Sequence, residues 1–233
     1  MRRARSRPGT GWSPSCSARC RRAVAGFEDA AARWNGRYAA EGFLFGTAPN
    51  DTLAAQAGLF APGDRVLCVA DGEGRNSTWL AGRGCAVTAF DLSEVGLAKA
   101  AALAAERGVE VDYRRASIDA WGWDDPGTGA PFDAVVAVFV QFANPSQRAA
   151  MFEGFGRALR PGGLLMLVGY GPLQMDYRTG GPGILSHLYD EPMLREAFAG
   201  WRIERLHRAQ RMLHEGGGHD GMSDVLELVA RRT

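Results

Sequence analysis

Two glycines and one aspartate, Gly72, Gly74 and Asp91, have the residue types and spacing that hold a nucleoside. The glycines follow an apolar run at 66–70, and Asp91 directly follows a second run at 86–90. A glycine lets a ligand lie against the backbone where a Cβ would block it, and one carboxylate can accept hydrogen bonds from two vicinal ribose hydroxyls. This order of strand, glycine turn, helix, strand and acid predicts a nucleoside site on a doubly wound α/β sheet.

The residue at position 77 separates two classes of nucleoside ligand. A dinucleotide-binding turn carries a third glycine three residues after the second, where it allows close helix packing. This chain has Ser77 at that position. The pattern therefore disfavours an NAD-linked oxidoreductase.

Alternating helical and apolar segments must position these residues. Periodicity and turn residues predict helices at 27–41, 51–59, 94–107, 146–159 and near 191–199, and strands at 66–70, 86–90, 109–114, 132–139, 164–169, 202–206 and 225–230. Ser93 is expected to cap the helix at 94–107. The run at 132–139 is apolar almost throughout, as in a central parallel strand covered on both faces. The last two strands are expected to form a hairpin.

Charge is distributed unevenly along the 233 residues, although the net charge is only +1. Before Glu28 the chain has seven arginines and no acid. Its composition suits a transit peptide or a nucleic-acid-binding arm, but apolar periodicity is lacking, so we favour a disordered basic extension over residues 1–25 or a misplaced start codon. The net charge of the whole chain gives no electrostatic argument for a nucleic-acid or membrane partner, and without this segment the domain is mildly acidic.

Cysteine and histidine spacing indicates neither a disulfide framework nor a metal site. Cys68 and Cys85 lie in apolar strand contexts, and the four histidines lack metal-ligand spacing. Lys99 is the only lysine of the chain, and such a bias toward arginine suggests a GC-rich bacterial gene. A cytoplasmic protein, monomeric or homodimeric, is the expectation.

The segment Ala70-x-Gly72-x-Gly74 and the turn Leu159-Arg160-Pro161-Gly162-Gly163 resemble those of class I S-adenosylmethionine (SAM) methyltransferases. Within that class the chain looks like the TehB-like, tellurite-resistance branch of small-molecule methyltransferases. The matching motifs are Gly74-Arg75-Asn76-Ser77, Trp34-Asn35-x-Arg37-Tyr38, Phe45-Gly46-x-x-Pro49-Asn50, Gly180-Gly181-Pro182 and Leu213-His214. The resemblance implies a Rossmann-like domain over 26–233, with a seven-stranded, mostly parallel sheet and helices on both faces.

The same resemblance implies SAM as the cofactor and a set of cofactor-binding residues: Asp71, Gly72, Gly74, Asn76, Asp91, Leu92, Ser117, Ile118 and Phe139. Three positions depart from the family pattern. Cys68 replaces the acid of the first strand, so Asp71 either substitutes for it or caps the following helix. Ser117 stands where an acid often faces the adenine. Gln141 replaces a frequent histidine.

Methyl transfer from a sulfonium needs mainly alignment of the acceptor and exclusion of water. A small-molecule acceptor is expected, either a thiol or a soft chalcogen nucleophile such as selenite or tellurite, with Tyr38, Gln141, His214 and His219 as candidates to shape or deprotonate it. Tyr38 is equally a candidate for packing the N-terminal helix, and His219 for a solvated turn. Glu215 replaces an arginine of the tellurite-type pattern, which predicts repulsion of oxyanions and preference for a neutral acceptor.

Two other functions stay open from the sequence. Methylation of nitrogen in protein or RNA would resemble enzymes with an Asn/Asp-Pro-Pro-aromatic motif, which is absent after residue 139. A non-catalytic SAM-binding regulator is kept open by Cys68 and Ser117.

Overall fold

The computed structural model describes residues 29–233. The basic extension predicted for residues 1–25 lies outside this described range. Residues 29–38 form a helix, and the prediction for 27–41 extends beyond its end at Tyr38.

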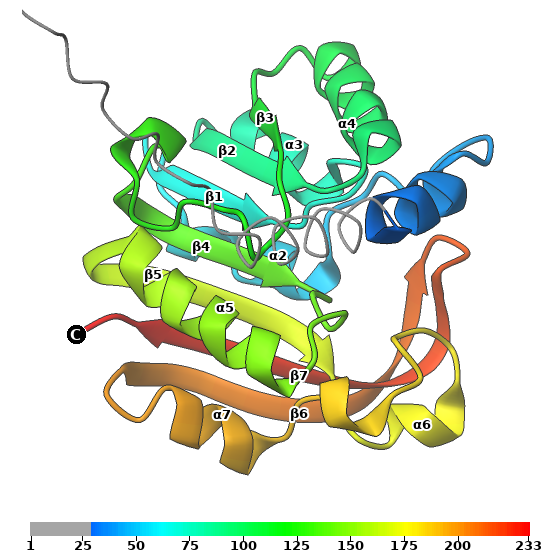
Figure 1. Ribbon diagram of the computed structural model, residues 1–233, viewed down its shortest axis with the longest axis vertical. Helices are drawn as coiled ribbons and strands as arrows, with labels where there is room; N and C mark the ends of the chain where they lie inside the picture. Colours follow the sequence, from blue (N-terminus) through cyan, green and yellow to red (C-terminus); the bar gives the residue numbers. More distant parts are fainter. Residues whose placement is uncertain (1–28) are drawn as a thin grey trace, which may run out of the picture.

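A single seven-stranded sheet forms the centre of the molecule (Figure 1). Its strands are β1 (Arg65–Val69), β2 (Ala86–Asp91), β3 (Asp112–Arg115), β4 (Phe132–Val138), β5 (Leu159–Tyr170), β6 (Arg202–Glu215) and β7 (His219–Arg231). The order across the sheet is β3-β2-β1-β4-β5-β7-β6. The first five strands are parallel, and β7 pairs antiparallel with both β5 and β6. The predicted fold class is confirmed.

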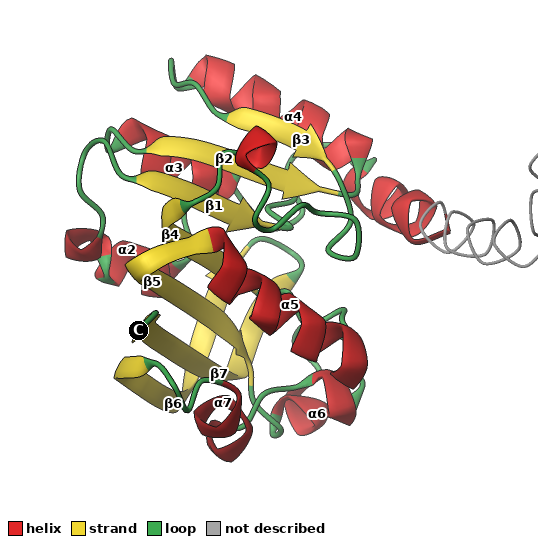
Figure 2. Cartoon of the chain, turned by 60° about the vertical axis from the view of Figure 1, so that its left-hand side comes forward, coloured by secondary structure: helices red, strands yellow, loops and turns green. Residues whose placement is uncertain are grey.

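Helices cover both faces of this sheet (Figure 2). They are α2 (Asp51–Ala55), α3 (Arg75–Gly82), α4 (Glu94–Glu106), α5 (Pro145–Ala158), α6 (Gln174–Tyr177) and α7 (Glu191–Ala197). Phe155 of α5 and Leu194 of α7 belong to one buried core, and Leu53 of α2 and Leu80 of α3 to the core on the opposite face. The central strands β4 and β5 contribute to both cores, which explains their continuous apolar sequence.

The last hairpin is much longer than the sequence predicts. We expected strands at 202–206 and 225–230, whereas β6 and β7 pair continuously as far as Glu215 opposite His219. The additional length carries polar residues, because cross-strand ion pairs such as Arg208–Asp224 (2.7 Å) and Arg211–Glu227 (2.8 Å) replace apolar contacts. Hydrophobic periodicity therefore could not detect it.

Candidate active site

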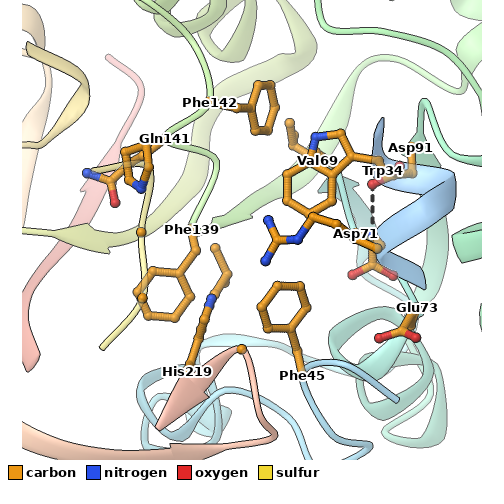
Figure 3. Close-up of a pocket in the computed structure, with 18 of the residues that line it drawn as sticks. Trp34, Phe45, Val69, Asp71, Glu73, Asp91, Phe139, Gln141, Phe142 and His219 are labelled. Carbon is orange, nitrogen blue, oxygen red and sulfur yellow. Dashed lines mark hydrogen bonds between the residues drawn. The ribbon is translucent and has the colours of Figure 1, made fainter. Parts of the chain in front are cut away.

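One cavity of about 640 Å³ opens where β1 and β4 lie side by side. The chain leaves β1 toward β2 and β3, and leaves β4 toward β5, so the order of strands reverses here. Ligands of open α/β sheets bind at such a reversal, beyond the carboxyl ends of the strands. Val69, Asp91 and Phe139 line the cavity from the ends of β1, β2 and β4 (Figure 3).

Asp91 connects the second strand to the glycine turn. Its Oδ2 accepts a hydrogen bond from the Gly72 amide at 2.9 Å, and its Oδ1 accepts one from the Ser93 amide at 2.8 Å. Each carboxylate oxygen keeps a further lone pair for a ligand. Burial raises the pKa of Asp91 to about 6, although both amides oppose that shift.

The turn requires glycine at Gly72 and at Gly74 for different structural reasons. Gly72 has φ +62°, and a Cβ there would lie 2.6 Å from the Tyr38 hydroxyl. Gly74 has φ +85°, and its Cβ would lie 2.6 Å from that of Ala100 on α4. Gly72 therefore lets Tyr38 reach the cavity, whereas Gly74 lets α4 pack against the turn and does not itself line the cavity.

Asp71 lines the cavity and is half-buried. Its Oδ2 accepts a hydrogen bond from the Ser77 hydroxyl in the first turn of α3. Burial raises its pKa to about 7, and the bond from Ser77 limits the shift. The N-cap residue Gly74 has no side chain with which to cap α3, and Asp71 is hydrogen-bonded to Ser77 in the first turn of that helix, so both alternatives for Asp71 stay open. Cys68 is buried in the core and lies outside the cavity.

The remaining predicted cofactor residues divide into two groups. Asn76, Leu92 and Phe139 line the cavity. The side-chain Oδ1 of Asn76 accepts a hydrogen bond from the backbone amide of Asn50 at 2.9 Å. Ser117 and Ile118 do not line it. Ile118 is buried in the core, and the Ser117 carbonyl closes a turn with Trp121 at 3.0 Å.

His219 forms the opposite wall of the cavity together with three aromatic rings (Figure 3). Its ring centroid lies 4.4 Å from that of Phe45, 4.3 Å from that of Phe139 and 5.6 Å from that of Tyr170. It is only 6% exposed, so the solvated-turn alternative is wrong. Burial lowers the pKa of His219, which keeps the imidazole neutral near pH 7.

His214 lies on the outside of the same hairpin. Its side chain is 72% exposed and its Nδ1 lies 2.8 Å from Oδ1 of Asp220. It does not line the cavity. In the hairpin, His219 pairs with Glu215, whereas His214 pairs with Asp220. Neighbouring residues of a strand point to opposite faces, so the two histidines lie on opposite faces of the hairpin.

Gln141 and Tyr38 both line the cavity, but their side chains differ in how they are bonded to the protein. The Gln141 amide is bonded to Tyr170, donating from Nε2 to its carbonyl at 2.8 Å and accepting from its backbone amide. Gln141 thus secures the end of β5. Tyr38 is buried and stacks on Trp34 at 5.4 Å, and burial raises the pKa of its hydroxyl well above the usual range. It can donate a hydrogen bond but is no base.

Glu215 does not face the cavity as an unpaired anion. Its Oε2 lies 2.7 Å from Nη2 of Arg75, and its Oε1 accepts a hydrogen bond from Nδ2 of Asn50 at 2.7 Å. Burial raises its pKa, but His219 and Arg75 outweigh burial and lower it to about 2. Arg75 balances this charge, so Glu215 is not the unpaired carboxylate on which the expected repulsion of an oxyanion depends, and the acceptor preference itself stays a prediction.

Several lining residues were not predicted as site residues. They are Arg33, Trp34, Arg37, Phe45, Glu73, Arg75, Phe142, Asn144, Gln147, Tyr170, Gly180, Gly181, Pro182, Ile184 and His187, among others. Many belong to the motifs that carry the TehB-like resemblance, and that was the available signal. Nδ1 of His187 lies 3.2 Å from the backbone carbonyl oxygen of Gln141, to which it can donate a hydrogen bond.

Among residues 29–233, no group of three or more His, Cys, Asp or Glu side chains is arranged to hold a metal ion. No helix within the described part of the chain is long and apolar enough to cross a membrane.

Known sequences match the part of the chain that builds the glycine turn. Residues 66–163 match the family described as "Methyltransferase domain". An uncharacterised protein of Mycobacterium tuberculosis is 39% identical over 111 residues, 47% of this chain and 38% of that protein. A ubiquinone biosynthesis O-methyltransferase of Azotobacter vinelandii is 38% identical over 101 residues, 43% of this chain and 42% of that enzyme. The chain thus spans about two fifths of the length of these curated relatives.

Solved structures are similar over most of the chain. One, described for the conversion of a disulfide bond into a thioacetal group during echinomycin biosynthesis, has 22% identity and a TM-score of 0.70, over 88% of this chain and 91% of that one. TehB from Haemophilus influenzae has 20% identity and a TM-score of 0.66, over 80% and 63%. Magnesium protoporphyrin IX methyltransferase from Synechocystis with bound SAM has 20% identity and a TM-score of 0.55, over 78% and 75%. Residues 66–163 therefore match a methyltransferase domain, and the chain has the fold of the class I SAM-dependent methyltransferases.

Proposed function

We propose that this protein transfers a methyl group from SAM to a small-molecule acceptor whose nucleophile is a thiol or another soft chalcogen. The observation that carries the proposal is the set of residues that line the cavity between β1 and β4. Asp91 and the glycine turn lie on one wall, and the neutral base His219 lies on the other, among aromatic rings.

The first wall suits the cofactor. Asp91 keeps lone pairs for the ribose hydroxyls, and Leu92 offers an apolar surface beside it. Asp71 would face the ammonium group of the methionine part of SAM. Burial raises the pKa of the Asp71 carboxyl, and the positive charge of that ammonium group would favour its ionised form. A volume of about 640 Å³ lies within the range of ordinary ligand sites.

The second wall suits a soft acceptor. When bound, SAM supplies a methyl group made electrophilic by its sulfonium. His219 takes the proton of the acceptor S–H group as the sulfur forms its bond to the methyl carbon, and the electron pair of the broken bond stays on the cofactor sulfur. A thiol, with a pKa near 8.5, needs only a weak base of this kind.

The comparisons support the acceptor class in different ways. The structural neighbour from echinomycin biosynthesis is described for chemistry at sulfur, and TehB lies in the branch that the sequence motifs resemble. The Azotobacter relative is named an O-methyltransferase, which makes a phenolic hydroxyl the second candidate acceptor.

The proposal is tested by incubating the purified protein with methyl-labelled SAM and a panel of acceptors. The panel contains thiols, selenite, tellurite, phenols, a peptide mixture and RNA, and headspace analysis detects volatile products. We expect labelled thioethers or selenoethers. Transfer to phenols alone would move the acceptor to oxygen, and transfer to peptide or RNA would favour the nitrogen alternative. SAM binding with no transfer to any acceptor would contradict catalysis and support a SAM-binding regulator.

Two histidine variants make the assay specific to the site. His219→Asn should lower kcat at least about 100-fold, the usual loss on removal of a general base. His214→Asn should retain kcat within about twofold, because its side chain lies outside the cavity. The reverse result would return the catalytic role to His214.

A further inference from the structure

Glu215 is a buried carboxylate at the meeting point of three segments that are far apart in the sequence. From α3, Arg75 pairs with its Oε2 at 2.7 Å. From the loop before α2, Asn50 donates to its Oε1 at 2.7 Å. Across the hairpin turn, Nδ1 of His219 lies 3.7 Å from the same Oε2. The cofactor turn, the loop and the acceptor wall are thus connected through one side chain.

We propose that Glu215 is a positioning residue for the transfer reaction: it holds the Nδ1–H edge of His219 toward itself, so that Nε2 is presented to the acceptor. This inference rests on the proposed function, and it assigns a role to a residue that acts through His219. Arg75 fixes Glu215 from the first position after the glycine turn.

The contacts of His219 favour this orientation. Its Nδ1 is buried and has no hydrogen-bond partner within the described residues, and Oε2 of the Glu215 carboxylate lies 3.7 Å from it. A buried N–H without a partner is costly, by about 1–3 kcal/mol. At 3.7 Å the pair lies slightly beyond hydrogen-bond distance, and catalytic contacts of this kind commonly shorten in the substrate complex.

Charges from each neighbouring element act on His219. Burial and the cations Arg75 (α3) and Arg37 (helix 29–38) lower its pKa, whereas Glu215 (β6) raises it. The Tyr170 hydroxyl on β5 stays neutral, because burial raises its own pKa. Glu215 is therefore the one anion among these groups that opposes the loss of basicity.

The step that Glu215 assists is a single proton transfer. The S–H bond of the acceptor breaks, its proton moves to Nε2 of His219, and the imidazolium that forms lies beside the Glu215 carboxylate. With SAM bound, the acceptor sulfur would form its bond to the methyl carbon while the methyl–sulfonium bond breaks and leaves its electron pair on the cofactor sulfur. His219 returns the proton to solvent after product release.

Glu215→Gln tests this role, with Glu227→Gln as the matched control. Glu227 is also a buried glutamate of the hairpin and is also ion-paired, to Arg205 and Arg211, but it does not contact His219. Without the Glu215 charge the pKa of His219 falls. We expect kcat to drop at least tenfold and the acid limb of its pH profile to move to lower pH, while SAM affinity changes by less than about threefold. Glu227→Gln should leave that limb unchanged.

A second measurement does not need catalysis. Long-range ¹H–¹⁵N correlation spectra of the intact protein report the tautomer of each imidazole, and His219→Asn identifies the signal of His219. We expect the Nδ1–H tautomer in wild type and in Glu227→Gln, with increased Nε2–H tautomer in Glu215→Gln. A wild-type His219 with bare Nδ1, or spectra and pH profiles that Glu215→Gln leaves unchanged, would overturn the inference. Absence of methyl transfer with the expected tautomer would count against the proposed function instead.

Discussion

At the scale of single residues, Asp91 has a structural role besides the ligand-binding role that we propose for it. Its two oxygens already accept hydrogen bonds from the Gly72 and Ser93 amides, so the same carboxylate shapes the glycine turn that it faces. An alanine would leave both amides without a partner. Asn is the better test, because its carbonyl oxygen can still accept one of these bonds.

Asp91→Asn should weaken SAM binding at least tenfold, which corresponds to about 1.4 kcal/mol. Charge-assisted hydrogen bonds to the ribose would be lost. Calorimetry measures the affinity, and Asp112→Asn on the edge strand β3 serves as the control, since Asp112 is exposed and outside the cavity. Unchanged affinity in a folded Asp91→Asn protein would rule out the ribose role.

The pH dependence of SAM binding follows from the same carboxyl. Its pKa is raised to about 6 in the folded protein, so the protonated form accumulates as pH falls below that value. A protonated carboxyl accepts hydrogen bonds more weakly, and SAM affinity should decline between pH 7 and pH 5. In Asp91→Asn this part of the decline should be missing. An identical pH dependence in both proteins would contradict the assignment to Asp91.

At the scale of elements, the turn between β6 and β7 builds part of the cavity wall. Gly218 lines the cavity, and a Cβ there would lie 2.3 Å from the Phe45 ring. Gly217, one residue earlier, has nothing within 4 Å of its Cβ position. A side chain at Gly218 would therefore collide with Phe45, whereas one at Gly217 would not meet any neighbour.

Gly218→Ala should displace Phe45 and with it the aromatic wall beside His219. We expect kcat/KM to fall about tenfold and the free energy of unfolding to fall by about 1–3 kcal/mol, the usual range for overpacking. Gly217→Ala should change neither quantity by more than a small amount. Steady-state kinetics and chemical denaturation measure both. Equal effects of the two variants would mean that the turn adapts and that the Phe45 contact is not required.

At the scale of the whole molecule, the cavity is lined by residues from Arg33 to His219, which span most of the described chain. Lys99 illustrates how distant parts are joined: its Nζ donates to the carbonyls of Ala40 and Gly42 and pairs with Glu73 at 3.1 Å. The loop that follows the N-terminal helix and the glycine turn are held together through this contact.

Deletion of residues 1–25 should leave both the melting temperature and SAM affinity nearly unchanged. The segment is basic and lacks apolar periodicity, so it is expected to bury little surface. Thermal unfolding and calorimetry of the shortened chain, beside the full chain at the same ionic strength, measure the two quantities. A drop of several degrees would show that the segment docks on the domain.

The parallel strands, the glycine turn and Asp91 could be predicted from the sequence, because each depends on local signals. Apolar runs mark buried strands, and a positive φ next to a close contact requires glycine at Gly72 and Gly74. Ser93 as the helix cap is likewise local, and the structure confirms it, since Ser93 Oγ accepts from the Gly96 amide at 3.0 Å.

Which of the two histidines lines the cavity, and which group balances the charge of Glu215, depend on contacts between residues that are distant in the sequence. Side-chain direction in the hairpin depends on register, and one residue of slip reverses every side chain. The polar part of β6 and β7 gives no apolar pattern from which to read that register, so His214 and His219 could not be distinguished. The charge of Glu215 is balanced by Arg75, 140 positions away in the sequence, and only the folded chain brings the two side chains together.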